Sequence, residues 1–322
     1  MGSKCSNPSP TPAIMMSSRL RSMFADPQKL ILLAGAHDAL GARLIREAGY
    51  DGVWASSLEI SCSKGVPDAG VLTMAEMARA STIIAQSVNI PVVSDCECGF
   101  GDARKVKEMV KKFEAAGVAA LCIADTPFPK LNSLVPGEHR LAAIPEFVEK
   151  IQVAKSTQRH PDFMVIARIE ALIAGAGQEE ALRRAQAYAA AGADAILIHS
   201  RSSSPDEIMA FIEAWDGIAP LVVVPTTYYS ISQRQLRQSG KVKMVIYANH
   251  GIRAAIAAMR RVFQQIREEE GAQQAEKWIC PLAELLQLNG VLEPDGVTPR
   301  RSQNPVFKEE ATRTATHSDA RP

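Results

Sequence analysis

The chain has 322 residues, of which 47% are hydrophobic and 22% are charged, and its formal net charge is +1. This composition supports a sizeable buried core, and the balanced charge gives no sign of nucleic acid, an anionic membrane or a polycationic protein as a partner. No apolar run reaches the roughly 18 residues of a membrane span, the first residues lack the apolar stretch of a secretory signal, and the six cysteines form no CxxC pair. We therefore expect a cytoplasmic protein with free thiols.

Two terminal segments, residues 1–17 and 299–322, are rich in polar residues and proline, and we expect both to be disordered. Residues 18–298 are predicted to form one catalytic domain, in which a short apolar run, a polar loop and a segment of helical periodicity alternate. The apolar runs are rich in Val and Ile and do not alternate with polar residues, as is typical of parallel strands buried on both faces. The runs span residues 30–34, 52–55, 91–94, 119–124, 163–167, 195–198, 220–224 and 244–248.

The segments between these runs have the end signals of helices. The segment 102–117, for example, opens with an Asp that can cap the helix and closes with a Gly. Eight such units in about 240 residues predict a (β/α)8 TIM-like barrel. A doubly wound open sheet is the alternative, but no G-x-G-x-x-G motif follows the first run. Amphipathic segments at 252–267 and 275–287 predict further C-terminal helices whose apolar stripes need a partner surface.

Polar side chains that could carry chemistry follow several of the apolar runs. Because the carboxyl ends of barrel strands meet at one rim, an acid after the third run, an arginine after the fifth and a histidine after the sixth are expected to lie close together. Burying such groups is costly unless they meet a metal, an anion or one another. The residues are Ser56, Ser57, Asp68, Asp95, Glu97, Asp125, Lys130, Asn132, Ser133, Arg168, Glu170, His199, Asn249 and His250.

These side chains suit a small anionic acid bound together with Mg²⁺. Asp95, with or without Glu97, offers the hard carboxylate oxygens that Mg²⁺ prefers. Arg168 can hold a carboxylate or a phosphate group through two hydrogen bonds, while His199 and the backbone amides of residues 56–58 add further donors. Each residue by itself also has a purely structural interpretation, such as Arg168 paired with a neighbouring acid.

Several stretches resemble the phosphoenolpyruvate mutase/isocitrate lyase superfamily, and most closely its phosphoenolpyruvate mutase and phosphonopyruvate hydrolase members. The resemblance covers roughly residues 30–267, and the stretch at 165–201 is long and specific. The stretches that carry it are "GVWASSLEIS", "GVPDAGVLTM", "FPKLNSL", "VIARIEALIAGAGQEEALRRAQAYAAAGADAILIHSR" and "VIYANHGIRAA".

The resemblance implies a Mg²⁺-dependent enzyme that interconverts phosphoenolpyruvate and phosphonopyruvate. It also implies a mobile lid at residues 128–134 and a homotetramer in which subunits exchange an eighth helix. The residues to which it assigns roles are Asp68, Lys130, Asn132, Arg168 and His199 in catalysis, Trp54, Ser56, Ser57, Leu58 and Ser133 in substrate binding, and Asp95 and Glu97 in metal binding.

The chain departs from the mutase pattern at the root of this lid. In the family, this pattern is Glu-Asp-Lys, then five residues, then Asn-Ser. In this chain Ala-Asp-Thr at 124–126 replaces Glu-Asp-Lys, whereas Asn132 and Ser133 keep the Asn-Ser end. Asn132 favours a mutase, because the hydrolase type tends to have Thr there. Glu97, which stands where the family usually has Asp, could fill part of the gap left by the missing acid at Ala124.

Three alternatives to the mutase stay open. A phosphonopyruvate hydrolase would use the same site to form pyruvate and phosphate, and the stretch "GVPDAGVLTM" resembles that type at least as well. A C–C lyase acting on a 2-methylmalate- or oxaloacetate-type acid is disfavoured, because lyases of this group often carry a lid Cys and residues 124–134 contain none. A degenerate binding or regulatory protein is disfavoured by the joint presence of the charged residues.

Overall fold

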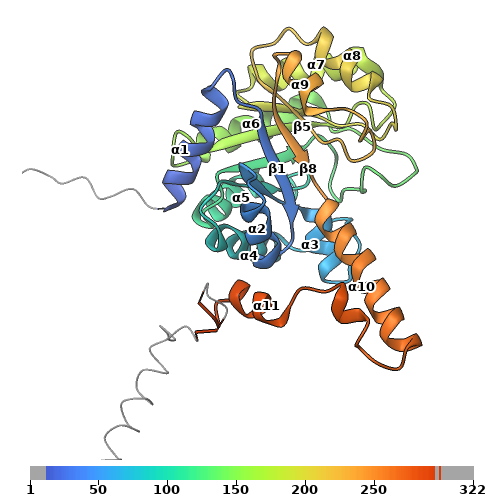
Figure 1. Cartoon of the computed structure of the whole chain (residues 1–322). Coiled ribbons are helices and arrows are strands. Elements are labelled where there is room, and N and C mark those ends of the chain that lie inside the picture. Colours follow the sequence, from blue (N-terminus) through green and yellow to red (C-terminus); the bar gives the residue numbers. More distant parts are fainter. Residues whose placement is uncertain (1–11, 294–296, 299–322) are drawn as a thin grey trace, which may run out of the picture. The chain divides into compact units, whose positions relative to one another are not determined.

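The computed structural model of the chain describes residues 12–293 and 297–298. Within them, eight parallel strands pair in chain order and close into a barrel where β8 pairs with β1 (Figure 1). The predicted (β/α)8 barrel is confirmed. The strands are β1 (Ile31–Ala36), β2 (Gly52–Ala55), β3 (Val92–Asp95), β4 (Ala120–Ala124), β5 (Met164–Ile169), β6 (Ala195–Ile198), β7 (Leu221–Val223) and β8 (Val242–Tyr247).

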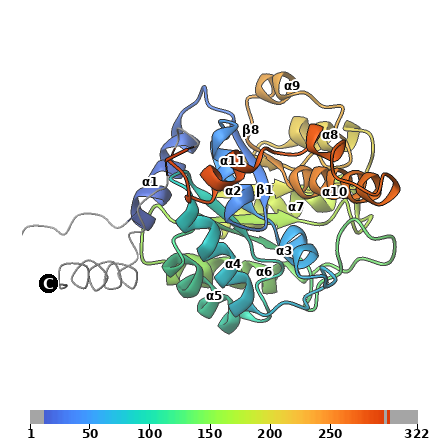
Figure 2. The same ribbon diagram turned by 60° about the horizontal axis from the view of Figure 1, so that its bottom comes forward.

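Helices connect the strands, and neighbours such as α2, α4 and α5 follow one another around the outside of the sheet (Figure 2). The predicted end signals act as expected: Asp102 caps the helix that follows it by accepting from the Lys105 amide, and Gly117 closes that unit with φ of 86°. The helices are α1 (Pro12–Ala25), α2 (Ala39–Glu47), α3 (Ser57–Ser63), α4 (Met74–Ser87), α5 (Ala103–Ala115), α6 (Ile144–Thr157), α7 (Gly177–Ala190), α8 (Asp206–Ala214), α9 (Gln233–Gln238), α10 (His250–Glu268), the 3-10 turn η1 (Ala275–Lys277) and α11 (Leu282–Leu288).

The strands have apolar residues on both faces, because one face fills the barrel and the other packs against the helices. On β4, for example, Ala120 and Cys122 belong to the interior cluster, whereas Leu121 and Ile123 belong to the layer between sheet and helices. The same alternation directs Ala124 into the upper end of the barrel. Inward positions at the carboxyl ends of the strands therefore face a common space.

Helix α1 corrects the expectation that residues 1–17 are disordered, because the helix begins at Pro12. Proline is well tolerated as the first helical residue, so a proline in a polar segment did not exclude a helix start. Leu20 and Phe24 of α1 pack into the interior cluster of the barrel. Arg21 pairs with Asp194, which precedes β6, so α1 covers the amino-terminal end of the barrel. Residues 1–11 and the predicted disordered tail 299–322 lie outside the described residues.

The chain divides into two compact units, residues 1–255 and 256–322. The second unit corrects one prediction, because the expected helix at 275–287 is split into η1 and α11. Pro281 separates them, since proline donates no backbone hydrogen bond and disfavours helical geometry in the residue before it. Within this unit the guanidinium of Arg261 lies 3.9 Å from the ring centre of Trp278. No helix in the described part of the chain is long and apolar enough to cross a membrane.

Candidate active site

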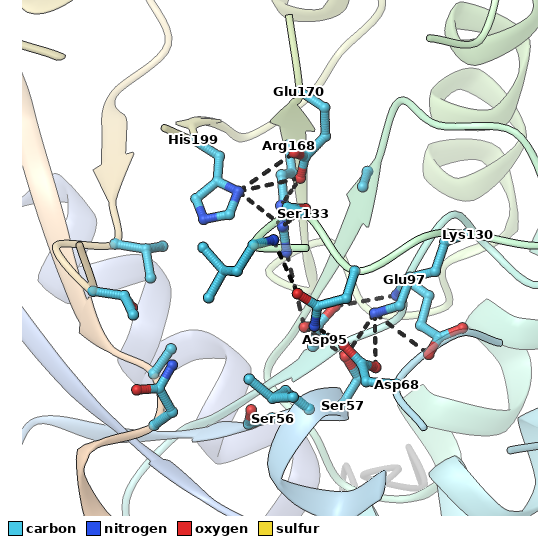
Figure 3. Close-up of a pocket in the computed structure, with 18 of the residues that line it drawn as sticks. Ser56, Ser57, Asp68, Asp95, Glu97, Lys130, Ser133, Arg168, Glu170 and His199 are labelled. Atoms are coloured by element: carbon cyan, nitrogen blue, oxygen red, sulfur yellow. Dashed lines mark hydrogen bonds and ion pairs between the residues drawn. The ribbon is translucent and has the colours of Figure 1, made fainter. Parts of the chain in front are cut away.

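A small cavity of about 60 Å³ lies at the carboxyl ends of the barrel strands (Figure 3). All twelve residues that the resemblance assigned to a site line this one cavity, although the role of each stays a prediction. The lining residues are Trp54, Ser56, Ser57, Leu58, Asp68, Asp95, Glu97, Lys130, Asn132, Ser133, Arg168 and His199, together with Ala124, Thr126, Leu131, Leu134, Glu170, Val224, Thr226, Ala248 and Asn249.

Arg168 of β5 is the centre of one half of the site, which is labelled in the upper part of Figure 3. Its guanidinium donates to Ser133 Oγ at 2.7 Å and to His199 Nδ1 at 2.9 Å, and its Nε pairs with Glu170. Burial alone would lower the pKa of Arg168, but the carboxylates of Glu170 and Asp95 outweigh it and raise that pKa. The arginine is therefore a permanent cation at the rim of the cavity.

Glu170 is the site residue that sequence reasoning left without a role. Burial would raise the pKa of its carboxyl, but Arg168 and His199 hold that pKa well below its usual range, so it stays ionised. Its position two residues after Arg168 could have indicated it, because alternate residues leave a strand on the same face. Asn249 and Thr226 also line the cavity. In the sequence, only their positions after predicted strands indicated that they could belong to the site.

His199 follows β6 and is buried and neutral. Burial lowers the pKa of its imidazole, and the nearby Arg168 charge lowers it further. His199 Nδ1 lies 2.9 Å from the Arg168 guanidinium and 3.4 Å from the Glu170 carboxylate. A guanidinium can only donate, so Nδ1 accepts in the shorter of these two contacts. The ring proton therefore sits on Nε2. A neutral histidine with this tautomer can donate one hydrogen bond to an anionic oxygen without adding a second full charge beside Arg168.

The segment 126–141 between β4 and α6, here called the lid, contains the predicted segment 128–134. Its residues Lys130, Leu131, Asn132, Ser133 and Leu134 line the cavity. Lys130 Nζ lies 3.0 Å from Asp68 Oδ1 and 3.5 Å from Glu97 Oε1, and it donates to Ser57 Oγ at 3.0 Å (Figure 3). Asn132 Nδ2 donates to Asp68 Oδ2 at 2.6 Å. These contacts hold Lys130 and Asn132 of the lid against groups of the cavity, whereas the predicted mobility of the lid stays a prediction.

The acidic half of the site suits a hard cation. Asp95 Oδ1 accepts from the Glu97 amide at 3.1 Å, and its Oδ2 accepts from Ser57 Oγ at 2.9 Å. The Oε2 atom of Glu97 is buried without a hydrogen-bond partner, which is costly unless a ligand meets it. Among the described residues no group of three or more His, Cys, Asp or Glu side chains is arranged to hold a metal ion. Mg²⁺ commonly takes one or two carboxylates and several waters, so Asp95 and Glu97 fit it.

Glu97 has an uncommon backbone conformation and a raised pKa. Its φ of 55° lies in the left-handed region, and the Ala124 amide donates to its carbonyl at 2.6 Å. Burial raises the pKa of Glu97 to about 6 against the opposing charge of Lys130, and the neighbouring carboxylates of Asp95 and Asp68 add to the rise. Such a pKa means that ionised Glu97 costs folding free energy at neutral pH.

Replacing Glu97 with Gln is therefore expected to stabilise the protein at pH 7.5 by about 2 kcal/mol. A carboxyl whose pKa rises from 4.5 to about 6 on folding stabilises the fold below pH 4.5 and loses that contribution as the pH rises through 6. The gain of Glu97→Gln should thus shrink towards pH 4.5. Thermal unfolding without added metal, measured across this range, tests the expectation. Glu138→Gln on the exposed lid surface is the control, and a gain independent of pH would contradict the account.

The comparisons with known proteins agree on one family. The sequence model described as phosphoenolpyruvate phosphomutase matches residues 20–267. The phosphonopyruvate hydrolase of Variovorax sp. (strain Pal2) is 45% identical over 266 residues, which are 82% of this chain and 92% of that relative. The crystal structure of phosphoenolpyruvate phosphomutase from Streptomyces platensis subsp. rosaceus is 47% identical with a TM-score of 0.84, and the match covers 93% of this chain and 99% of that one.

A solved structure of phosphonopyruvate hydrolase in complex with oxalate and Mg²⁺ is also similar. It is 43% identical with a TM-score of 0.81, over 85% of this chain and 95% of that chain. Relatives of both reaction types therefore match nearly the whole barrel at comparable identity.

Proposed function

We propose, from the premise that this chain belongs to the phosphoenolpyruvate phosphomutase family, that it is a Mg²⁺-dependent mutase interconverting phosphoenolpyruvate and phosphonopyruvate. The observation that carries the proposal is the closed lid, which places Asn132 within 2.6 Å of Asp68 and seats Lys130 among the site acids. A lid that closes over the reacting groups excludes water, and a mutase needs this because water would otherwise capture the phosphoryl group.

The donors suit a phosphoryl group passing between oxygen and carbon. Such a transfer proceeds through a loose, metaphosphate-like state whose charge lies on the non-bridging oxygens. Arg168, neutral His199 and Asn132 are the groups that would stabilise this charge, and all three line the cavity. No protein nucleophile is required, because C3 of the pyruvate enolate itself forms the new bond to phosphorus.

The opposite half of the cavity suits the pyruvate part of the substrate. The Ser56 hydroxyl and the amides of Ser57 and Leu58 would hold its carboxylate, and Trp54 would pack beneath it. Asp95 and Glu97 would hold Mg²⁺, which when bound would polarise the pyruvyl oxygens and stabilise enolate charge. The relative that binds oxalate and Mg²⁺ supports this assignment, because oxalate is a small dianion like the pyruvate enolate.

A phosphonopyruvate hydrolase is the second candidate, and the 45% identity to a protein of that type favours it. The two reactions share the cleavage of the carbon–phosphorus bond and differ in what receives the phosphoryl group. The enolate oxygen receives it in the mutase, whereas a water molecule receives it in the hydrolase.

The ³¹P NMR spectrum of the protein incubated with phosphonopyruvate and Mg²⁺ separates the candidates. Formation of phosphoenolpyruvate supports the mutase, and formation of inorganic phosphate supports the hydrolase. An unchanged spectrum would refute both and leave a lyase or a binding protein. The same samples with oxalate added test the shared site, because oxalate should inhibit either reaction.

The lid root offers a test of the metal site. Ala124 faces the cavity, and the Oγ1 atom of Thr126 is buried there without a hydrogen-bond partner. Restoring the family pattern with Ala124→Glu and Thr126→Lys should tighten Mg²⁺ binding about tenfold, as expected for groups that orient metal ligands and waters. Titration calorimetry with Mg²⁺ measures the change. Thr126→Lys alone is the control, and it should not tighten binding. An unchanged Kd in the double variant would count against a metal at Asp95 and Glu97.

We further propose that the protein is a cytoplasmic homotetramer in which α10 is exchanged between subunits. In support, α10 has no buried residue within the single chain, and Met259, Phe263 and Ile266 expose large apolar side chains at helical spacing. Light scattering of the purified protein measures the mass, and a monomer would refute the proposal.

A further inference from the structure

A buried cluster lies beneath the lid root and outside the cavity lining. Its centre is Asp125, which is fully buried. Asp125 Oδ2 accepts from the Tyr188 hydroxyl and from Arg184 Nη1, each at 2.8 Å. Both of these residues belong to α7, two turns of which thus reach a carboxylate at the end of β4. Sequence reasoning had placed Asp125 among the residues at the rim, but its side chain turns away from the cavity into this cluster.

The second carboxylate oxygen of Asp125 connects the cluster to the half of the site that contains Arg168. Asp125 Oδ1 accepts from the Glu170 amide at 2.8 Å, and the Asp125 amide donates to the Arg168 carbonyl at 3.0 Å. Both contacts hold the end of β5, from which Arg168 and Glu170 enter the site. The position of Arg168 therefore depends on a carboxylate that α7 anchors.

The cluster also holds the two ends of the lid together. Asp125 precedes the lid and Ala142 follows it, and the Ala142 amide donates to the Asp125 carbonyl at 2.8 Å. Arg184 Nη1 donates to the Ala142 carbonyl at 2.9 Å as well as to the Asp125 carboxylate. One guanidinium thus binds both ends of the lid. The ring of Tyr188 packs edge-on against Phe147 of α6, with 4.6 Å between the ring centres, which ties in the helix that the lid leads into.

Burying these polar side chains costs desolvation free energy that apolar packing at the same positions would not cost. Asp125, Arg184 and Tyr188 are all buried, and ion pairs in the interior are often no more stable than apolar residues of similar volume. Buried polar networks do, however, fix one geometry among several, because each unsatisfied alternative is costly. The geometry fixed here is that of the lid ends and of the Arg168 strand end at the same time.

We propose that Tyr188 and Arg184 are positioning residues: through Asp125 they set the closed lid in register with Arg168 and Glu170. The contribution to catalysis rests on the proposed function, whereas the contribution to the lid does not. When the cluster is intact, closing the lid delivers Lys130 and Asn132 opposite Arg168. When it is loosened, the lid closes less often and less accurately, although no residue that lines the cavity has been replaced.

The test is Tyr188→Phe, which removes one hydroxyl and keeps the ring on Phe147. Hydrogen exchange followed by mass spectrometry should show the lid amides of residues 126–141 exchanging about tenfold faster, since a hydrogen bond to a carboxylate is lost. With phosphonopyruvate as substrate, kcat should fall about tenfold while KM changes less than about twofold. Should this variant fail to fold, Arg184→Lys, which keeps the charge but not the forked contacts, carries the same expectations.

Tyr228→Phe is the matched control. Tyr228 is equally buried, and its hydroxyl accepts from the Val224 amide at 3.1 Å, away from the lid ends. This control should lower Tm and leave exchange in the lid unchanged. If Tyr188→Phe lowers Tm in the same way and lid exchange does not change, the cluster is structural only and the proposal is wrong. If the wild-type protein does not turn over phosphonopyruvate, the proposed function fails, and the exchange experiment still decides the role of the cluster.

Discussion

Replacing Arg168 with Ala should lower kcat/KM by more than about 3 kcal/mol of transition-state stabilisation, or more than about 150-fold. Arg168 is the permanent cation of its half of the site, and its donors reach Ser133 and His199. Its removal takes away the strongest group facing the transferring phosphoryl oxygens. Steady-state kinetics with phosphonopyruvate, or with whichever substrate the NMR experiment identifies, measures the loss.

The same substitution should also reveal the ion pair that the largely buried Arg168 forms with the buried Glu170. Losing one partner of a buried ion pair costs about 3–5 kcal/mol of folding free energy. The double variant Arg168→Met with Glu170→Gln should regain most of that stability without regaining activity. Exposed Arg104→Ala is the control for charge removal. Full activity in a folded Arg168→Ala variant would refute the assigned role, and so would equal recovery of activity and stability in the double variant.

His199 provides an independent readout of the Arg168 variant. In the wild-type protein, burial and then Arg168 lower the pKa of His199, whereas Glu170 opposes them. Without the guanidinium the opposing carboxylate remains, so the imidazole pKa should rise. A histidine resonance followed by NMR should therefore titrate at higher pH in Arg168→Ala than in the wild type.

Replacing Lys130 with Ala should have the second-largest effect, again more than about 3 kcal/mol of transition-state stabilisation. Lys130 joins the lid to three groups of the cavity, namely Ser57, Asp68 and Glu97. Burial alone would lower the pKa of Lys130, but the surrounding carboxylates, Asp95 first, raise it above its ordinary value. The ammonium therefore stays charged across neutral pH, and titration of Lys130 should not shape the pH–rate profile there.

Lys130→Met separates the charge of Lys130 from its apolar stem. Met retains most of the buried stem, so a loss in Lys130→Met close to that in Lys130→Ala identifies the ammonium as the active part. Lys105→Ala, on the exposed side of α5, is the control. Near wild-type kcat/KM in both Lys130 variants would show that the lid does not bring this residue to the reacting group.

Local patterns were sufficient for the barrel and for some members of the site, whereas the resemblance supplied the individual roles. Parallel strands buried on both faces must be apolar throughout, and their helices must end at residues such as Gly117, so the units could be recognised without knowledge of any contact. Closure of the barrel then brings all strand ends to one rim. For this reason Asp95, Arg168 and His199 could be assigned to one site from their positions after strands.

The pairings inside the site could not be predicted in this way. Lys130 and Ser57 are separated by 73 residues, and Arg184 and Asp125 by 59. Such contacts depend on strand register, on the path of the lid and on which face of α7 turns inward. The hydrophobic periodicity of the sequence does not indicate any of these three features. Glu170 likewise has no distinguishing pattern until β5 places it beside Arg168.

The sequence by itself thus determined the barrel, its active rim and the kinds of groups on it, because periodicity and end signals act within one element. Only the tertiary structure decided which acid each cation meets, that Asp125 faces away from the cavity and that α1 begins at Pro12. The physical reason is that a buried charge is stable only beside its partner. Partners from distant elements meet only when the barrel closes and the lid packs against the cavity.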